Sequence, residues 1–268
     1  MPIHPAAVVS PDAVVDPTAE IGPLAIIEAH VKIAAECRVA SHAVIKEYTE
    51  IGRQTVVCEG AVVGGAAQHL RSTNVVGRVV IGERTVLREN VTVHRPLNDD
   101  GETRIGDDCF LMVGAHVAHD CQVAQGVMLT NNVLLGGHVE IGTRAVLGGG
   151  VAVHQFTRVG TLAMIGGCAR VVQDVPPFVL TDGDTGMIVG LNRIGLRRAG
   201  MPREAVQQLK EAYRLIYRSG LTFDEMVAAL KERFAEGPAS QFAPFFESSR
   251  RGFVQERRSP PRPVIRLH

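Results

Sequence analysis

An aliphatic residue returns at every sixth position along the first two thirds of the chain. From Ile3 to Val171, 27 of the 29 positions in this series are Ile, Leu or Val, whereas ordinary composition would give about ten. A second series, two residues earlier, holds only Ala, Val, Cys and Thr from Ala7 onward, apart from Leu97. Residues i and i−2 face the same side of a strand, and a period of six fits neither a helix nor a plain strand. The pattern predicts a parallel β-helix of hexapeptide repeats.

Three short strands would close one triangular coil of three hexapeptides. Stacked coils would then pair each strand with its copies above and below. Six Ile-Gly pairs fall in one phase of the repeat, and we expect their glycines to supply the backbone freedom of a turn. These glycines are Gly22, Gly52, Gly82, Gly106, Gly142 and Gly166.

The aliphatic series fails at His69 and Asp99. Both residues lie in polar or glycine-containing stretches, 64–78 and 95–102, which we expect to leave the coil as loops. Loops on a regular scaffold often carry functional residues. The repeat itself is expected to end at residue 177.

The remaining third of the chain changes character. We expect a linker over 178–200, an α-helical domain over 201–256 and a basic, disordered tail over 257–268. Apolar spacing and a capping box predict helices within the second of these segments. The expected helices cover 204–219, 222–236 and 240–250.

Charge and cysteine content narrow the function classes. The 28 basic residues balance the 28 acidic ones, so bulk nucleic-acid binding is not expected. The sequence has neither a secretory signal nor an apolar run of 18 residues, so no membrane-spanning segment is expected. The five cysteines form no C-x-x-C motif, which favours free thiols and a cytoplasmic protein.

Polar residues from successive coils are expected to stack into one patch. With three hexapeptides to a coil, Gly137 should lie above His119, and His138 above Asp120. None of the patch histidines falls in an inward phase, so the patch should lie on the outside of the prism. Its members are His116, His119, Asp120, Gly137, His138, His154 and Gln155.

Three interpretations of this patch compete. The spacing from His116 to Cys121 resembles a set of metal ligands, and γ-class carbonic anhydrases are metal-binding β-helix enzymes. Cys121 belongs to the inward series, however, so we expect no metal. Packing at a subunit interface would explain any single histidine. A catalytic site explains the group, because His119 adjoins Asp120 as a general base would, and a Gly137 N–H could stabilise an oxyanion.

Five segments follow a pattern known from one enzyme family. They are Val91–Arg95 (VTVHR), Ala115–Cys121 (AHVAHDC), Val153–Phe156 (VHQF), Gln173–Pro177 (QDVPP) and Tyr213–Gly220 (YRLIYRSG). Over nearly its whole length the chain resembles the acyl-ACP:UDP-N-acetylglucosamine O-acyltransferases of lipid A synthesis. The resemblance implies a left-handed coil and a homotrimer with active sites between neighbouring prisms. It also implies acyl carrier protein as donor and partner, a nucleotide-sugar acceptor and no cofactor.

The resemblance also implies roles for single residues. His119 would remove the proton from the sugar 3-hydroxyl, Asp120 would support it, and the Gly137 N–H would bind the oxyanion. Four side chains would line the substrate cleft: His116, His138, His154 and Gln155. The other implied substrate contacts are Gln68, His69 and Arg71 in the sugar loop, Gly167 at the acyl chain, and Asn192 and Arg198 at the nucleotide or phosphate. A glycine at 167 implies a deep acyl groove.

Four positions depart from the family pattern, all of them outside the catalytic centre. His69 replaces an acid that holds sugar hydroxyls, and Thr185 replaces a histidine near the acyl donor. Ile194 and Ala199 replace a glutamate and an arginine that meet the nucleotide. Acyl transfer is therefore better supported than the identity of the acceptor. The sequence leaves N-acyl transfer to an amino-sugar nucleotide and a non-catalytic β-helix binding protein as alternatives, and it does not fix the acyl length.

Overall fold

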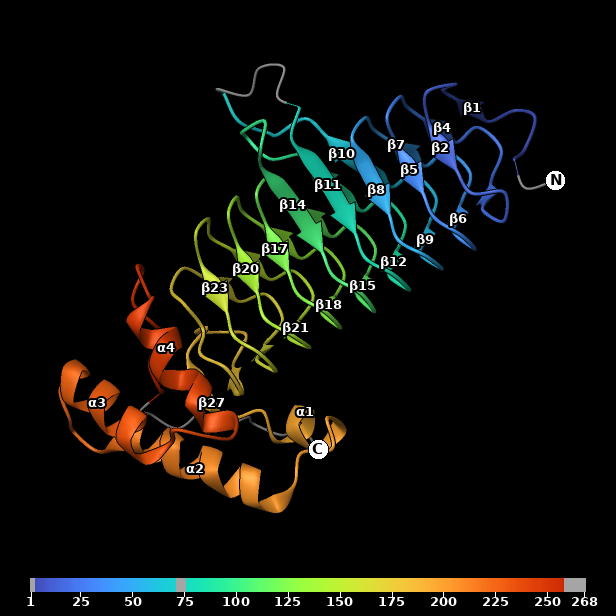
Figure 1. Cartoon of the computed structure of the whole chain (residues 1–268). Coiled ribbons are helices and arrows are strands. Elements are labelled where there is room, and N and C mark those ends of the chain that lie inside the picture. Colours follow the sequence, from blue (N-terminus) through green and yellow to red (C-terminus); the bar gives the residue numbers. More distant parts are fainter. Residues whose placement is uncertain (1–2, 71–75, 258–268) are drawn as a thin grey trace, which may run out of the picture.

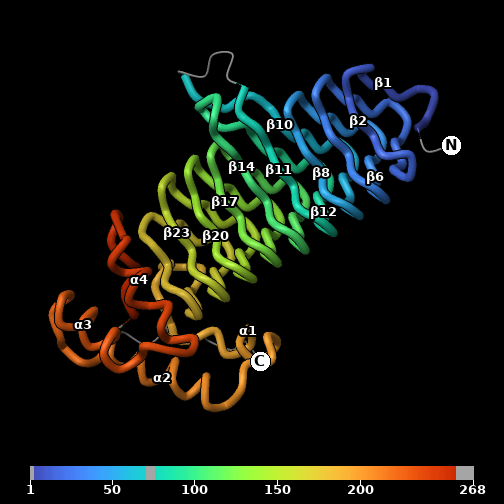
Figure 2. The backbone as a smooth tube through the Cα atoms, in the orientation of Figure 1, coloured from blue at the N-terminus to red at the C-terminus, as the bar shows by residue number. Residues whose placement is uncertain are grey.

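The structure is a computed structural model that describes residues 3–70 and 76–257. The chain forms a long triangular prism, a left-handed parallel β-helix, with helices packed at its C-terminal end (Figure 1). Figure 2 shows the coils stacked from the blue N-terminal end to the yellow end, where the orange and red helices lie. No helix in the described ranges is long and apolar enough to cross a membrane.

Three sheets form the three faces of the prism, and nearly all of their strands pair in parallel. The first face contains β1 (Val8–Val9), β4 (Ile26–Ile27), β7 (Val44–Ile45), β10 (Val62–Gly65), β13 (Thr92–His94), β16 (His116–Val117), β19 (Leu134–Leu135), β22 (Ala152–Val153) and β25 (Arg170–Val171). The second face contains β2 (Val14–Val15), β5 (Lys32–Ile33), β8 (Thr49–Ile51), β11 (Arg78–Ile81), β14 (Glu102–Ile105), β17 (Gln122–Val123), β20 (Glu140–Ile141) and β23 (Arg158–Val159). The third face contains β3 (Glu20–Ile21), β6 (Arg38–Val39), β9 (Val56–Val57), β12 (Val86–Leu87), β15 (Phe110–Leu111), β18 (Met128–Leu129), β21 (Val146–Leu147), β24 (Met164–Ile165), β26 (Val179–Thr181) and β27 (Ile188–Leu191).

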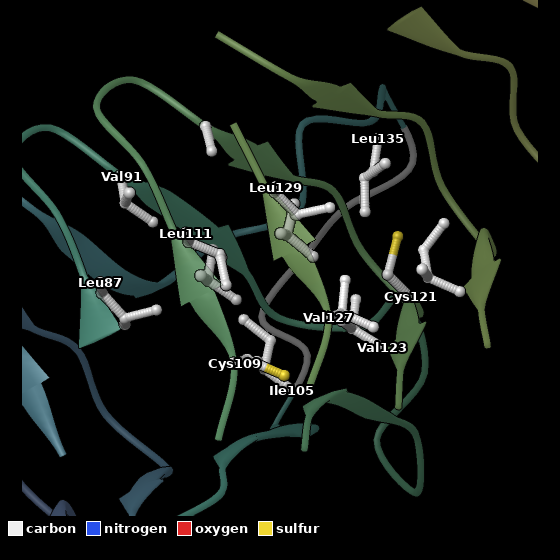
Figure 3. Packing of buried hydrophobic residues seen from close by; sticks show 14 of the residues in the cluster. Leu87, Val91, Ile105, Cys109, Leu111, Cys121, Val123, Val127, Leu129 and Leu135 are labelled. Carbon is white, nitrogen blue, oxygen red and sulfur yellow. The ribbon is translucent and has the colours of Figure 1, made fainter. Parts of the chain in front are cut away.

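The two inward series fill the prism as their spacing predicts. Leu111 and Leu129 are fully buried and belong to the aliphatic series, while Cys109 and Val127 come from the small-residue series (Figure 3). Burying a Leu or Val side chain contributes about 1.5–3 kcal/mol. The core is therefore one continuous column of aliphatic side chains.

The glycines of the Ile-Gly pairs serve a different purpose from the one expected. Their φ angles are not positive; a Cβ at Gly142 would lie 2.5 Å from the backbone N of Thr161 in the next coil. These glycines thus allow coils to approach closely. The left-handed turn conformation falls two residues later, for example at Arg144 with φ 56°. Non-glycine residues bear that conformation at most corners, at a cost of about 1–2 kcal/mol each.

Two coils are longer than the rest because they carry the expected loops, called here the first loop (within 64–78) and the second loop (within 95–102). Val62 pairs with Thr92, and Thr92 pairs with His116. These separations exceed the usual coil by two hexapeptides and by one. Whole hexapeptides leave the inward phase unchanged, which is why the aliphatic series continues beyond both loops.

Residues 178–200, expected as a linker, contain regular structure. β26 adds to β24 in parallel and so continues the third face, and β27 turns back antiparallel. A short helix follows, α1 (Arg193–Arg198). Pro176 and Pro177 interrupt the repeat, but the alternation of Val179 and Thr181 still suits a strand, since both side chains are buried.

The helical segment is close to its expected extent. It contains α2 (Arg203–Arg218), α3 (Phe223–Arg233), the 3-10 helix η1 (Pro238–Gln241) and α4 (Phe242–Glu247). Thr222 caps α3 in the predicted capping box with Glu225. The expected third helix is shorter: a 3-10 turn begins at Pro238, a position where proline is well tolerated, and the α-helix that follows ends at Glu247.

Aromatic packing and ion pairs hold the helices on the prism. Phe178 from the prism contacts Phe242 of α4, with ring centroids 5.8 Å apart. Arg158 pairs with the buried carboxylate of Asp174 at 2.7 Å and also donates to the carbonyl of Phe245. Arg257, expected within the disordered tail, pairs with Asp182 at 2.6 Å and is ordered. The rest of the tail, 258–268, lies outside the described residues.

Candidate active site

A histidine–aspartate pair occupies the corner between the first and second faces, directly after β16. His119 Nδ1 lies 2.8 Å from Asp120 Oδ2. Asp120 has a φ of 60°, the left-handed turn conformation that directs its carboxylate beside the preceding ring. Because an ionised carboxylate only accepts, Nδ1 carries the proton and the Nε2 lone pair is left to act as a base. The adjacency expected from the sequence is thus a direct hydrogen bond.

Backbone groups fix the orientation of Asp120. The backbone N–H of Asp120 donates to Thr103 Oγ1 at 2.8 Å. The N–H of Leu97 donates at 3.1 Å to Asp120 Oδ2, the oxygen that also bonds His119. The side chain of Asp120 is only 13% exposed. The carboxylate is therefore held by the second loop as well as by the coil.

Gly137 lies against the ring of His119, as the stacking of coils predicts. A Cβ at this position would lie 2.5 Å from His119 Nε2. Since Gly137 has no positive φ, space rather than backbone freedom requires a glycine. The residue is buried, and its N–H has no hydrogen-bond partner among residues 3–70 and 76–257.

Aromatic rings enclose the pair. His69 meets the His119 ring edge-on at 5.8 Å between centroids, and His138 meets it at 5.2 Å. His138 in turn stacks on Phe156 at 4.5 Å. His119 lies outside the prism core, as expected, but only 8% of it is exposed. The periodicity gave its direction but could not reveal the cover that the loop provides.

A second pair of imidazoles, those of His116 and His94, lies on the neighbouring strands β16 and β13. His116 Nδ1 is 2.8 Å from Thr92 Oγ1, and its ring centroid is 5.0 Å from that of His94. Burial, with a smaller effect from His94, lowers the pKa of His116 to about 4, so this ring is neutral near pH 7. His94 was not singled out as a site residue, although it lies within one of the family segments.

The structure excludes Cys121 from the proposed metal site but brings other ligand atoms together. Cys121 is fully buried, its Sγ donates to the Gly136 carbonyl at 3.1 Å, and burial raises its pKa to about 12. It is therefore no ligand. His119, Asp120 and His138 do offer ligand atoms within 4.8 Å of one another. On another corner, a separate group also offers ligand atoms within 4.8 Å of one another: Cys58, Glu59 and Glu89.

The other candidate residues lie apart from this corner. Asn192 and Arg198 line a cavity of about 1580 Å³ between the third face and helices α1 and α2. Asn192 caps α1 by accepting from the N–H of Gly195, and its Nδ2 donates to the Leu162 carbonyl at 2.8 Å. The exposed Ile194 lines the same cavity.

The remaining candidates are divided between loop and corners. Gly167 follows β24 at the corner between the third and first faces, where a Cβ would lie 3.3 Å from the Gly149 carbonyl oxygen. His154 and Gln155 are exposed one coil above Gly137, and Gln68 is exposed beside His69. Thr185 donates to Asp182 in a turn. Arg71 lies outside the described residues.

The sequence of this chain is similar to those of known acyltransferases. A family model described as "Udp N-acetylglucosamine O-acyltransferase; Domain 2" matches residues 174–254, and one described as "GMPPB C-terminal domain" matches residues 3–98. An acyl-[acyl-carrier-protein]–UDP-N-acetylglucosamine O-acyltransferase of Burkholderia orbicola is 39% identical over 211 residues, which are 76% of this chain and 80% of the relative. The chain belongs to the acyl-[acyl-carrier-protein]–UDP-N-acetylglucosamine O-acyltransferase family.

Solved structures agree with this membership. The UDP-N-acetylglucosamine acyltransferase of Francisella novicida is 34% identical, with a TM-score of 0.92, covering 95% of this chain and 94% of that one. The O-acyltransferase of Moraxella catarrhalis is 36% identical with a TM-score of 0.90, covering 95% and 100%. The chain is thus an acyltransferase of this family, with both the prism and the helical end that the family shares.

Proposed function

We propose that the protein moves an acyl chain from acyl carrier protein to the 3-hydroxyl of UDP-N-acetylglucosamine, with His119 as the general base. One observation carries the assignment of the base. The His119–Asp120 hydrogen bond lies against Gly137, in a chain that belongs to this acyltransferase family.

In the first step His119 Nε2 takes the proton of the sugar hydroxyl as its oxygen attacks the thioester carbonyl. Asp120 supports this by accepting from Nδ1, which fixes the tautomer and stabilises the imidazolium that forms. The new C–O bond converts the carbonyl oxygen into an oxyanion. The Gly137 N–H, with no partner among the described residues, is the donor that we assign to that oxyanion.

In the second step the tetrahedral intermediate collapses. Its C–S bond breaks, the carbonyl re-forms, and the thiol of the carrier's prosthetic arm leaves with the proton held by His119. His119 is then neutral again and ready for another turnover. His116 is neutral, and the half-buried His138 and the exposed His154 are the imidazoles that we assign to substrate contacts.

The distribution of candidate residues favours a homotrimer. His119 lies at one corner, Gly167 at another, and Asn192 and Arg198 beside the third face. One substrate pair would have to reach all of them, which a single prism does not allow because its packed core lies between. Neighbouring prisms that present different corners to one cleft would complete the site.

The acyl chain is assigned to the corner of Gly167. Gly149, Gly167 and Gly183 follow one another along this corner, where none of them projects a side chain. A column without side chains leaves a groove in which a long acyl chain can lie. The donor is acyl carrier protein with its thioester, and no cofactor enters the scheme.

Two further proposals concern the setting of the reaction. We assign the protein to the cytoplasm, supported by the five free cysteines of the described chain. We also propose that no metal takes part, since His119 uses Nδ1 for Asp120 and needs Nε2 for the proton. Elemental analysis that found one zinc or iron per chain, with activity lost to chelators, would contradict this.

A donor and acceptor panel tests the proposed function. Acyl carrier protein loaded with several acyl lengths is combined with UDP-N-acetylglucosamine and with its 3-amino analogue, and products are read by mass spectrometry. We expect O-acylated UDP-N-acetylglucosamine and a trimeric mass by light scattering. No acyl transfer to either sugar would overturn the proposal.

The amino sugar is included because of His69. This imidazole stands beside the His119 ring, at a position where the resemblance implies an acid in family members. A kcat/KM at least about tenfold higher for the 3-amino acceptor would make the enzyme an N-acyltransferase on the same machinery.

A further inference from the structure

The two loops of the prism are tied together where each of them begins. His94 Nδ1 lies 2.7 Å from the Ala66 carbonyl oxygen, and the N–H of Arg95 donates to the Gly65 carbonyl at 2.7 Å. His94 is only 9% exposed. The segment that opens the second loop therefore fixes the N-terminal end of the first.

The same segment holds the C-terminal end of the first loop. Asp99 Oδ1 accepts from the N–H of Val76 at 2.7 Å. Gly77 packs against the second loop so closely that a Cβ would lie 2.5 Å from the Asn98 carbonyl oxygen. Both described ends of the first loop thus rest on residues 94–101.

Residues 94–101 also contact the catalytic pair. The N–H of Leu97 donates to Asp120 Oδ2, the oxygen that accepts from His119. Leu97 is the one exception in the small-residue series, so at this position the repeat gives way to a loop contact. A single short segment therefore touches the first loop at both ends and the carboxylate of the base.

We propose that residues 94–101 act as a brace that sets the first loop over the active site, and that Asp99 is a positioning residue for the nucleotide-sugar acceptor. This rests on the proposed function, in which Gln68 and His69 of the first loop contact the sugar. Asp99 touches no reacting atom. It acts through Val76, by restricting the loop whose residues bind.

The two contacts of the brace predict separable effects. Loss of the Asp99 bond frees one end of the first loop, so the loop must be ordered again each time the acceptor binds, and this ordering costs binding energy. The Leu97–Asp120 bond is untouched, so the geometry of the base stays as it is. KM for the sugar should therefore change while kcat does not.

The test compares three variants in steady-state kinetics with acyl carrier protein and UDP-N-acetylglucosamine. Asp99→Ala removes the acceptor of the Val76 bond, whereas Asp99→Asn keeps an oxygen that can accept it. Asp100→Ala is the matched control, because Asp100 is an exposed acid in the same loop and its side chain makes no hydrogen bond or ion pair within the described ranges.

We expect Asp99→Ala to raise KM for the sugar by about three- to tenfold, the range of one typical intramolecular hydrogen bond. KM for the acyl donor and kcat should stay within twofold of wild type, Asp99→Asn should restore most of the affinity, and Asp100→Ala should behave as wild type. Equal loss in both Ala variants would overturn the brace, as would a fall in kcat alone or no change. A wild-type enzyme without transfer activity would instead refute the proposed function.

Discussion

The same prism corner carries almost the same side chains at two heights, but only one of them adjoins the His119–Asp120 pair. Near the N-terminus, His30 stacks on Tyr48 with ring centroids 5.1 Å apart; in the later coils, His138 stacks on Phe156 at 4.5 Å. All four residues have φ between 58° and 63°. Backbone and stacking are thus shared, and neither makes a site.

The difference lies in the neighbouring column and in the loops. The residue before His30 is Ala29 and the one before His138 is Gly137, which leaves room for the ring of His119 below it. His30 is exposed, whereas His119 is covered by the first loop through His69. We therefore expect a histidine at this corner to act as a base only with a carboxylate partner, a glycine above it and a loop residue against its ring.

Replacing the base should produce the largest effect. We expect His119→Ala to lower kcat by about 10²–10⁴-fold, the usual contribution of a general base. The thermal midpoint should change little because the ring lies outside the aliphatic core. His30→Ala, at the equivalent corner, is the control and should retain full activity. More than a tenth of wild-type activity in His119→Ala would rule out its role as base.

The space above His119 is the next feature to test. Gly137→Ala would bring a methyl group into the ring, so we expect kcat to fall by about 10- to 100-fold as the base is displaced. Gly22→Ala serves as the control: its Cβ would crowd the backbone N of Ser41 at 2.9 Å in an N-terminal coil, away from His119, so kcat should stay at the wild-type value. Steady-state kinetics and a crystal structure of the variant would locate the ring. Wild-type kcat in Gly137→Ala would mean that the contact is not needed.

The loop contact can be sharpened by restoring the family's acid. With UDP-N-acetylglucosamine as the natural acceptor, His69→Asp should leave its KM unchanged or lower it by up to about tenfold, the value of one charge-assisted hydrogen bond. Leu70→Asp adds the same charge on a fully exposed neighbour and should have no effect. A shift of preference between the hydroxyl and amino acceptors would show that His69 selects the acceptor.

The smallest expected effect concerns the half-buried imidazole of His116. The pKa of His116 is lowered to about 4, so between pH 6.5 and 4 the unfolded chain binds more protons there than the folded one does. The stability contribution is complete above pH 6.5 and is lost as the pH falls toward 4. Allowing for partial exposure, we expect about 1 kcal/mol.

Chemical unfolding across that pH range measures this contribution. The slope of unfolding free energy with pH should be flatter in His116→Gln than in wild type. His42→Gln, which removes an exposed histidine, is the control and should keep the wild-type slope. Parallel curves for His116→Gln and wild type would contradict the assignment.

The prism could be predicted from the sequence because the same kinds of inward residue recur in every coil. The sequence was also sufficient for the contact between His119 and Gly137, since two residues one coil apart must stack. It was not sufficient for Leu97 or Asp99, whose contacts depend on how irregular loops fold against each other. The Ile-Gly glycines were found but misread, because a sequence does not distinguish a need for backbone freedom from a need for space.

The linker shows the same limit. β26 follows two prolines and has no glycine in phase, so the repeat pattern ended before the third face did. The capping box of α3 was found because it is local. Asn192 was assigned to a ligand by resemblance alone. One end of its amide caps the adjacent helix α1, but the bond from its other end to Leu162 depends on contact with a distant corner of the prism.

Loops built from whole hexapeptides also set a rule for changing this protein. The first loop adds two repeat units and the second adds one, so the coils beyond them keep their alignment with the coils before. A graft of six or twelve residues at a corner should be accepted in the same way. New binding loops exchanged in these increments would leave the six-residue spacing of the inward side chains unbroken along the whole prism.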